Sequence, residues 1–169
     1  ARDLSLVNEF RGRELEFLTM TNINTISVEE VKAISQDDFS IIEYFITDKA
    51  LFIFLFDNGR LLVKKEDLES KKLYEIIKSY RDMLSSSSVV SSTTYQKSNE
   101  LYKILLQPVI NEVSRKRIYI VPHSWLHYLP FQALYDGKNF IVSRYAVTYS
   151  PSATVIKISL TKRAGKKNS

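Results

Sequence analysis

The chain has 169 residues, a net charge of +5, and enough hydrophobic (44%) and aromatic (12%) side chains to build a packed core in one domain or two small ones. It contains no cysteine, which excludes disulfides, cysteine metal sites and a cysteine nucleophile within these residues. We find neither a signal-like start nor an apolar run long enough to span a bilayer, so we expect a cytoplasmic protein that does not contact a membrane.

Two helical signals open the chain. Residues 1–26 carry leucine and valine at near-helical spacing and predict a preceding helical segment or the end of a helical repeat. Ser27 followed by Glu30 has the pattern of a capping box, in which each side chain accepts the other residue's backbone N–H. This pattern predicts a short helix over residues 27–35.

The next segment has the pattern of an antiparallel meander. Asn58-Gly59 lies between two apolar runs, and both residue types accept the positive φ angles that a tight hairpin requires. The three predicted strands cover residues 41–46, 50–56 and 60–64.

Two amphipathic helices are predicted beyond the meander. The first covers residues 67–84 and the second residues 98–114, where Pro108 is expected to kink it because proline lacks the backbone N–H. Residues 85–98 between them are rich in serine and threonine, and we interpret them as a mobile loop.

Residues 117–152 contain the most informative pattern. A β-branched run predicts a strand over 117–121 that ends at Pro122, and a second strand is expected over 140–149. Asp136-Gly137 provides a turn between the two strands. Pro151 stops the second strand and is suited to the start of a helix, with Ser150 as the expected N-cap.

This region resembles the opening signature of the CHAT domain, a caspase-like and separase-like family that is often fused to TPR repeats. The order is strand, Val-Pro, Leu-His-x-Leu-Pro-Phe-x-Ala-Leu, x-Asp-Gly, strand, Tyr-Ser-Pro-Ser. The signature residues are Pro122, Leu126, His127, Leu129, Pro130, Phe131, Leu134, Asp136, Gly137, Ser150, Pro151 and Ser152. One departure follows the first strand, where the family often has Asp-Gly and this chain has His123-Ser124.

The resemblance implies an α/β, caspase-like layered fold, of which this chain provides an N-terminal portion: a β-hairpin or meander, flanking helices and part of a mostly parallel central sheet. Residues 27–160 correspond to the N-terminal, pseudo-caspase-like part of a CHAT domain, and residues 161–169 to a basic tail or truncated loop. In the family the catalytic His/Cys dyad lies downstream of the Ser-Pro-Ser block. The resemblance therefore implies no catalytic residue in this chain.

The implied parent is a cysteine endopeptidase regulated by partner binding. Its expected partners are the remainder of the CHAT domain, adjacent TPR-like repeats and a regulatory protein or ribonucleoprotein, since some CHAT proteases act in prokaryotic defence. The alternative is a non-enzymatic CHAT-like scaffold with a basic tail for nucleic acid or an acidic partner. Nucleic-acid contact is expected only through the cations of residues 157–169, which contain no acid and equal the net charge in number: Lys157, Lys162, Arg163, Lys166 and Lys167.

The only histidines, His123 and His127, are four residues apart, a spacing that a zinc site can use on a helix. Pro122 and Pro130 bracket them and no carboxylate lies between them, so we expect no metal. We interpret His127 as a hydrogen-bonded core or interface residue. No cofactor is expected either, because the four glycines are isolated and form no phosphate-binding loop.

Overall fold

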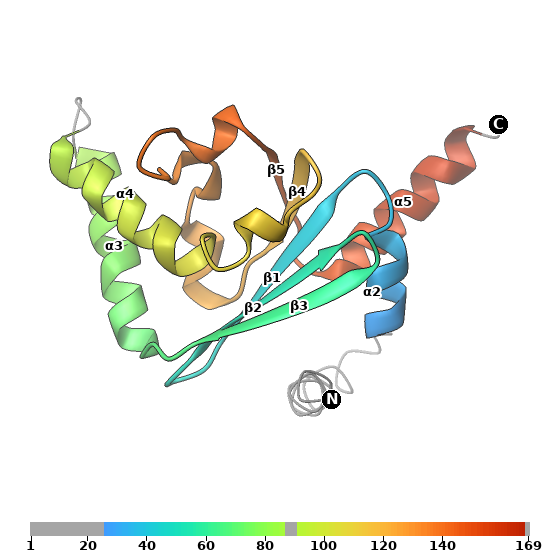
Figure 1. Ribbon diagram of the computed structural model, residues 1–169, viewed down its shortest axis with the longest axis horizontal. Coiled ribbons are helices and arrows are strands. Elements are labelled where there is room, and N and C mark those ends of the chain that lie inside the picture. The colour runs from blue at the N-terminus through green and yellow to red at the C-terminus, as the bar shows by residue number, and fades with distance from the viewer. Residues whose placement is uncertain (1–25, 87–90, 168–169) are drawn as a thin grey trace.

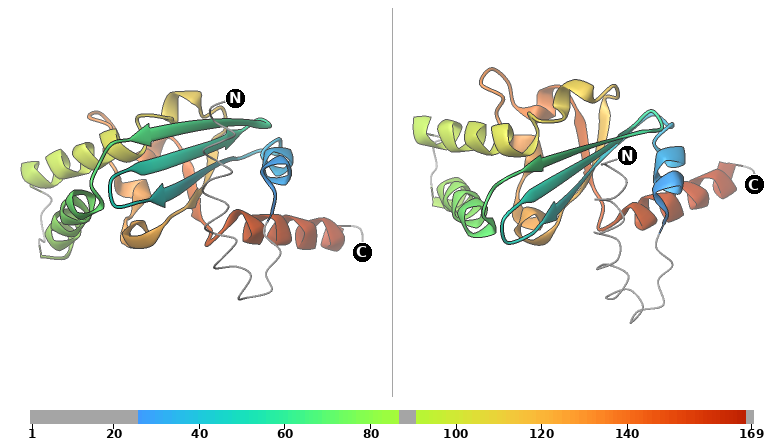
Figure 2. Two further views of the ribbon diagram at one scale, coloured as in Figure 1. Left: turned by 90° about the horizontal axis from the view of Figure 1, so that it is seen from below. Right: turned by 60° about the horizontal axis from the view of Figure 1, so that its bottom comes forward.

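The computed structural model describes residues 26–86 and 91–167, which form a mixed α/β structure with a five-stranded sheet (Figure 1). Helices lie against both faces of the sheet, so the predicted layered α/β class is confirmed (Figure 2). The expected helical segment over residues 1–26 lies outside the described residues, apart from Ile26.

The sheet has the strand order β3-β2-β1-β4-β5. Strands β1 (Ser40–Ile46), β2 (Leu51–Asp57) and β3 (Arg60–Glu66) form the predicted antiparallel meander. Asn58 and Gly59 have φ angles of 48° and 74°, which confirms the tight turn between β2 and β3. The pair of β1 with β4 (Arg117–Val121) and the pair of β4 with β5 (Ala146–Tyr149) are parallel, whereas β1 with β2 and β2 with β3 are antiparallel. The sheet is therefore mixed, and not mostly parallel in its pairing as the family resemblance implied.

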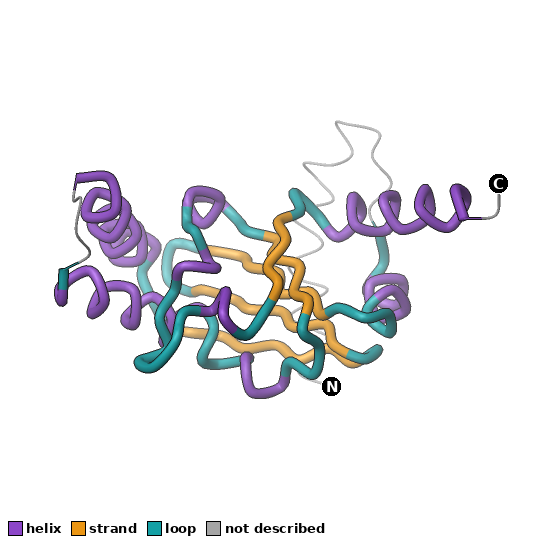
Figure 3. Tube along the Cα trace, turned by 90° about the horizontal axis from the view of Figure 1, so that it is seen from above, coloured by secondary structure: helices purple, strands orange, loops and turns teal. Residues whose placement is uncertain are grey.

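The larger core covers one face of the sheet. Helices α3 (Ser70–Ser86) and α4 (Ser92–Leu105) pack there, together with residues 122–145, which link β4 to β5 and are called the connector below. The connector contains the short 3-10 helices η2 (Ser124–Tyr128), η3 (Phe131–Ala133) and η4 (Ile141–Ser143). Seen from above, α3 and α4 lie toward the left end of the strands, and α2 and α5 toward the right end (Figure 3).

The smaller core covers part of the opposite face. Helices α2 (Val28–Ile34) and α5 (Ala153–Lys167) pack there against alternate residues of the strands, such as Ile41, Phe56 and Val121. The capping box of α2 is confirmed: the Ser27 N–H donates to the Glu30 carboxylate at 2.8 Å, and the Glu30 N–H donates to Ser27 Oγ at 3.1 Å.

The predicted Ser/Thr-rich loop over 85–98 is wrong for most of its length. Helix α3 continues to Ser86, and α4 begins at Ser92 with Ser91 as its N-cap; residues 87–90 lie outside the described part. The hydroxyl of Ser98 is buried and donates to the Ala133 C=O at 3.0 Å while accepting the Tyr135 N–H at 2.9 Å. Serine is tolerated inside α4 because these bonds to the connector satisfy its hydroxyl.

Three other expected elements end or begin elsewhere. Helix α4 ends at Leu105, so Pro108 follows the helix and does not kink it; a short 3-10 helix, η1 (Ile110–Glu112), comes after the turn. The second signature strand begins only at Ala146, because the preceding residues form η4 and a turn. Helix α5 continues to Lys167, across the expected boundary at residue 160, so residues 161–167 are helical and not a loop.

No helix of the described residues is both long and apolar enough to cross a membrane.

Candidate functional site

The carboxyl ends of the parallel strands β1, β4 and β5 lie next to one another at one end of the sheet. This is the position at which open α/β sheets commonly bind ligands. A pocket of about 230 Å³ lies there, and we call it the strand-end pocket. It is lined by Val28, Glu43, Tyr44, Phe45, Phe54, Phe56, Leu61, Val121, Pro122, His123, His127, Pro151 and Ser152.

Four signature residues line the strand-end pocket: Pro122, His127, Pro151 and Ser152. Two peptide segments that are about 30 residues apart in the sequence are therefore brought together, because β4 and β5 pair in parallel and end side by side. The signature thus marks a real spatial site, and not only a set of core positions.

His123 connects the loop after β4 to the end of β1. Its Nδ1 accepts the backbone N–H of Ile46 at 3.1 Å, and its ring packs on Phe45 with the ring centroids 4.7 Å apart. Burial, with a smaller contribution from His127, lowers the pKa of His123. The imidazole is therefore neutral near pH 7 with its proton on Nε2, and its lone pair on Nδ1 is already used.

His127 is exposed at the edge of the strand-end pocket, on η2. The expectation of a core histidine is wrong, because the 3-10 turn directs Leu126 and Leu129 inward and leaves the two residues between them, His127 and Tyr128, on the surface. A role for His127 at an interface stays a prediction. Among the described residues, no three His, Cys, Asp or Glu side chains are close enough together to hold a metal ion.

The apolar signature residues form the inner side of the connector. Leu126, Leu129, Phe131 and Leu134 are at most 2% exposed and belong to the larger core. Their positions explain the Leu-x-x-Leu-x-Phe-x-x-Leu spacing, since consecutive 3-10 turns return every third residue or so to the sheet.

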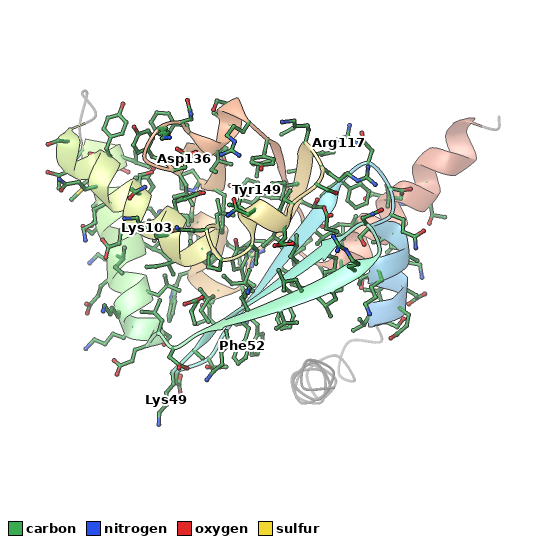
Figure 4. The ribbon with its side chains drawn as sticks, in the orientation of Figure 1. Lys49, Phe52, Lys103, Arg117, Asp136 and Tyr149 are labelled. Carbon is green, nitrogen blue, oxygen red and sulfur yellow. The ribbon has the colours of Figure 1, made fainter. Side chains whose placement is uncertain are left out.

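The hydroxyl of Tyr149 attaches β5 to the connector. It accepts the Phe131 N–H at 2.8 Å and lies 2.6 Å from Gln132 Oε1 and 3.2 Å from the Leu129 C=O, to which it can donate. Burial raises the pKa of Tyr149, which keeps this hydroxyl protonated and able to donate. Tyr149 points toward the connector (Figure 4).

Asp136 and Gly137 form the predicted turn. One oxygen of Asp136 accepts the backbone N–H groups of Lys138 and Asn139, both at 2.7 Å, and the other lies 3.2 Å from Arg144 Nη1. The backbone bonds, followed by Arg144, lower the pKa of Asp136. Gly137 has a φ of 101°, which favours glycine. This pair organises the connector and does not face the strand-end pocket.

The N-cap of α5 is Ser152 and not Ser150. Ser152 Oγ accepts the Val155 N–H at 3.3 Å, whereas the Ser150 N–H still donates to the Ile120 C=O at 2.9 Å. Because Ser150 remains paired with β4, the helix can begin only two residues later. The start of α5 therefore lies at the edge of the strand-end pocket.

Lys157 and Lys162, two cations of the expected tail, lie on α5. Lys157 Nζ forms an ion pair with the Glu30 carboxylate of α2, and this bond lowers the pKa of Glu30. Lys157 thus joins two helices of the smaller core, in place of projecting from a loop.

One buried carboxylate was missed by the sequence analysis. Asp57 is 3% exposed at the end of β2, and it accepts the Ser40 hydroxyl, the Ser114 N–H at 3.1 Å and the Ser114 hydroxyl at 2.7 Å. These bonds connect the starts of β1 and β4 to β2. Asp57 does not line the strand-end pocket, and its partners join strands, so we assign it a structural role.

The described residues bring no nucleophile and base together. No hydroxyl is hydrogen-bonded to either histidine in the described part of the chain, and the sequence has no cysteine. The strand-end pocket combines aromatic walls, two imidazoles and the carboxylate-bearing Glu43, which suits binding rather than covalent chemistry.

Comparison with known families identifies the signature region. Residues 96–169 match the CHAT domain, which confirms the resemblance over this part of the chain. The search of curated proteins found no match.

Two solved structures show a distant likeness. One is a Bacteroides thetaiotaomicron protein with an actin-like ATPase fold and unknown function, at 14% identity and a TM-score of 0.37, covering 75% of this chain and 38% of that one. The other is apo pSK41 ParM, at 13% identity and a TM-score of 0.35, covering 78% and 41% respectively. The chain spans about two fifths of either protein, and at these TM-scores neither likeness informs its fold or function.

Proposed function

We propose, from the CHAT-domain match over residues 96–169, that this chain provides the structural N-terminal part of a caspase-like cysteine endopeptidase. The catalytic His/Cys dyad of that peptidase is supplied by residues outside this chain. The proposal places the enzyme in the cytoplasm, where adjacent TPR-like repeats and a regulatory protein or ribonucleoprotein control it.

The state of His123 supports the structural role. A cysteine peptidase needs a thiolate and an imidazole with a free lone pair to accept its proton. In neutral His123 the Nδ1 lone pair is bonded to the Ile46 N–H and Nε2 carries the proton. His123 can act as a base only by breaking its bond to β1, so it fits the role of an anchor.

The strand-end pocket suits contact with the rest of such an enzyme. It lies where three parallel strands end, and four residues of the CHAT signature line it. A catalytic lobe that packs against these strand ends would be positioned by β1, β4 and β5.

The experiment has two arms. The reading frame beyond the codon for Ser169 is sequenced, and the longer protein is assayed for peptide-bond cleavage beside the chain of residues 1–169. We expect a His and a Cys at the ends of apolar strands downstream, cleavage by the longer protein and none by its Cys→Ala variant. Cleavage by residues 1–169 alone, or a longer protein without this dyad, contradicts the proposal.

The alternative scaffold proposal rests on the basic residues of α5. It predicts salt-dependent RNA binding that is lost when residues 157–169 are removed. The ion pair between Lys157 and Glu30 weighs against it, since one of the five cations is already used within the fold.

A further inference from the structure

The two edges of the sheet differ in charge. Strand β3 forms one edge and carries Arg60, Lys64, Lys65 and Glu66, the kind of charged residues that discourage another strand from pairing. Strand β5 forms the other edge and reads Ala-Val-Thr-Tyr, with no charge and with three residues of high β propensity. Edge β5 therefore has the composition of a strand that accepts a partner.

The backbone of β5 presents hydrogen-bonding groups to its outer side. The N–H of Ala146 donates to the Lys116 C=O at 2.8 Å and that of Ser150 to the Ile120 C=O at 2.9 Å. Residues alternate in a parallel pair, so Thr148 also faces β4, and Val147 and Tyr149 direct their N–H and C=O groups away from it. Within the described residues, these outer groups have no backbone hydrogen bond.

A groove of about 560 Å³ runs along this edge, between β5 and the connector. Val142 on its wall is 62% exposed and offers an apolar contact. The charged residues that line the groove are Lys116 and Arg144, and none of its lining residues is acidic. Arg144 Nη1 lies 3.2 Å from the Asp136 carboxylate, so Lys116 carries most of the positive charge of the groove. Arg117 is exposed at the adjacent start of β4 (Figure 4), which adds to the positive charge of this edge.

We propose that the outer edge of β5 binds an extended polypeptide segment with acidic side chains, which adds to the sheet as a further strand. Strand addition pairs the outward groups of Val147 and Tyr149 with the backbone of the partner, and alternate side chains of that partner reach the groove. Acidic residues there face Lys116, since Arg144 already pairs with Asp136. A second copy of this chain fits less well, because two β5 edges placed together bring like charges side by side.

This inference concerns a binding surface and does not depend on the peptidase role. The strand-end pocket and the β5 groove share no lining residue, so the two can be tested separately.

The probe is a short fluorescein-labelled peptide in which glutamate alternates with valine, titrated with the chain of residues 1–169 and followed by fluorescence anisotropy. Two matched peptides serve as controls: one has lysine in place of glutamate, and one carries N-methyl groups on alternate backbone amides. We expect the acidic peptide to bind at least about tenfold more tightly than either control and to weaken as salt is added. Equal binding by the lysine peptide or the N-methylated peptide overturns the proposal.

Two substitutions at one position separate the backbone from the side chain. Val147→Pro removes an N–H that faces outward, which an edge strand tolerates, whereas Val147→Ala shortens the side chain and keeps the N–H. We expect Val147→Pro to weaken acidic-peptide binding about tenfold or more and Val147→Ala to keep most of it. If Val147→Pro fails to fold, as judged by circular dichroism, the N-methylated peptide decides the same question.

Charge and self-association complete the test. Lys116→Glu should weaken binding of the acidic peptide and remove most of its salt dependence. Unchanged binding by Val147→Pro, or by Lys116→Glu, contradicts the proposal. Sedimentation that shows a dimer dissolved by Val147→Pro would identify a second copy as the occupant and would also overturn it.

Discussion

The imidazole Nδ1 of His123 lies 3.1 Å from the backbone nitrogen of Ile46, so a side chain that follows β4 accepts the last backbone donor of β1. The two strands are already paired in parallel, and this bond extends their contact into the loop where the CHAT signature begins. The bond exists only while Nδ1 is unprotonated.

This relationship predicts a pH-dependent stability. Burial and the nearby His127 lower the pKa of His123, so the unfolded chain, with a histidine pKa of about 6.5, binds the proton more tightly than the folded chain does. The stabilisation is therefore fully present above about pH 6.5 and is lost as pH falls toward the lowered folded value. We expect the urea midpoint to decrease between pH 7.5 and pH 5.

Other groups titrate in a different range. The carboxyls with lowered pKa values, Glu30 and Asp136, lose their contributions only below about pH 4. His123→Asn keeps an acceptor near the Ile46 N–H and should flatten the profile above pH 5, whereas His127→Asn at the exposed neighbour should leave most of it. If the urea midpoint of His123→Asn depends on pH as strongly as that of the unchanged chain, the effect belongs to another group.

The buried carboxylate of Asp57 should be among the most sensitive positions of the sheet. Asp57→Ala leaves the buried Ser40 hydroxyl without its acceptor and removes the two bonds from the exposed Ser114, which water can replace. One buried unsatisfied donor costs roughly 1–3 kcal/mol of the free energy of unfolding. Urea denaturation measures the loss. The exposed Asp67, with 84% of its side chain accessible, gives the control: Asp67→Ala should change stability by less than about 0.5 kcal/mol. Equal effects at both positions would refute a special role for Asp57.

Ser124 has a φ of 54°, in the left-handed region that disfavours side chains with a Cβ. It stands where the CHAT signature often has glycine, so this chain accepts backbone strain at a position that the family pattern avoids. We expect Ser124→Gly to raise the free energy of unfolding by about 0.5–1 kcal/mol and Ser124→Ala to give no gain. The thermal midpoint of the two variants measures the difference, and a less stable glycine variant would contradict the strain.

Local patterns predicted the elements whose determinants lie close together in the sequence. The Asn58-Gly59 hairpin and the Ser27-Glu30 capping box were predicted correctly, since each depends on residues at most three positions apart. The apolar signature residues were likewise expected to be structural, and the buried ones follow a spacing that is visible in the sequence. The strand-end pocket could be anticipated only in part, because the resemblance named four of its lining residues and did not predict that they lie close together.

Long-range partners explain what the sequence did not reveal. Asp57 has the sequence context of a turn residue, and its burial depends on Ser40 and on Ser114, which is 57 positions away. Ser150 was expected to cap α5, but its N–H belongs to the ladder with β4, so the cap moves to Ser152. The cause is the same in both cases. A polar group forms hydrogen bonds with residues that are distant in the sequence, which the local pattern does not include.

Ser98 provides the last test, since its segment was predicted to be a loop and is a helix that contacts the connector. Its hydroxyl donates to the Ala133 C=O, which also accepts the Tyr80 hydroxyl at 3.0 Å, and it accepts the Tyr135 N–H. Ser98→Ala leaves that partly buried N–H without its acceptor, so we expect a loss of about 1 kcal/mol in the free energy of unfolding. Ser92→Ala, at an exposed position of the same helix, should change it by less than about 0.5 kcal/mol. If both variants are neutral in urea denaturation, the hydroxyl of Ser98 does not hold α4 to the connector; if only Ser98→Ala is destabilised, the Ser/Thr-rich sequence is explained by these tertiary hydrogen bonds.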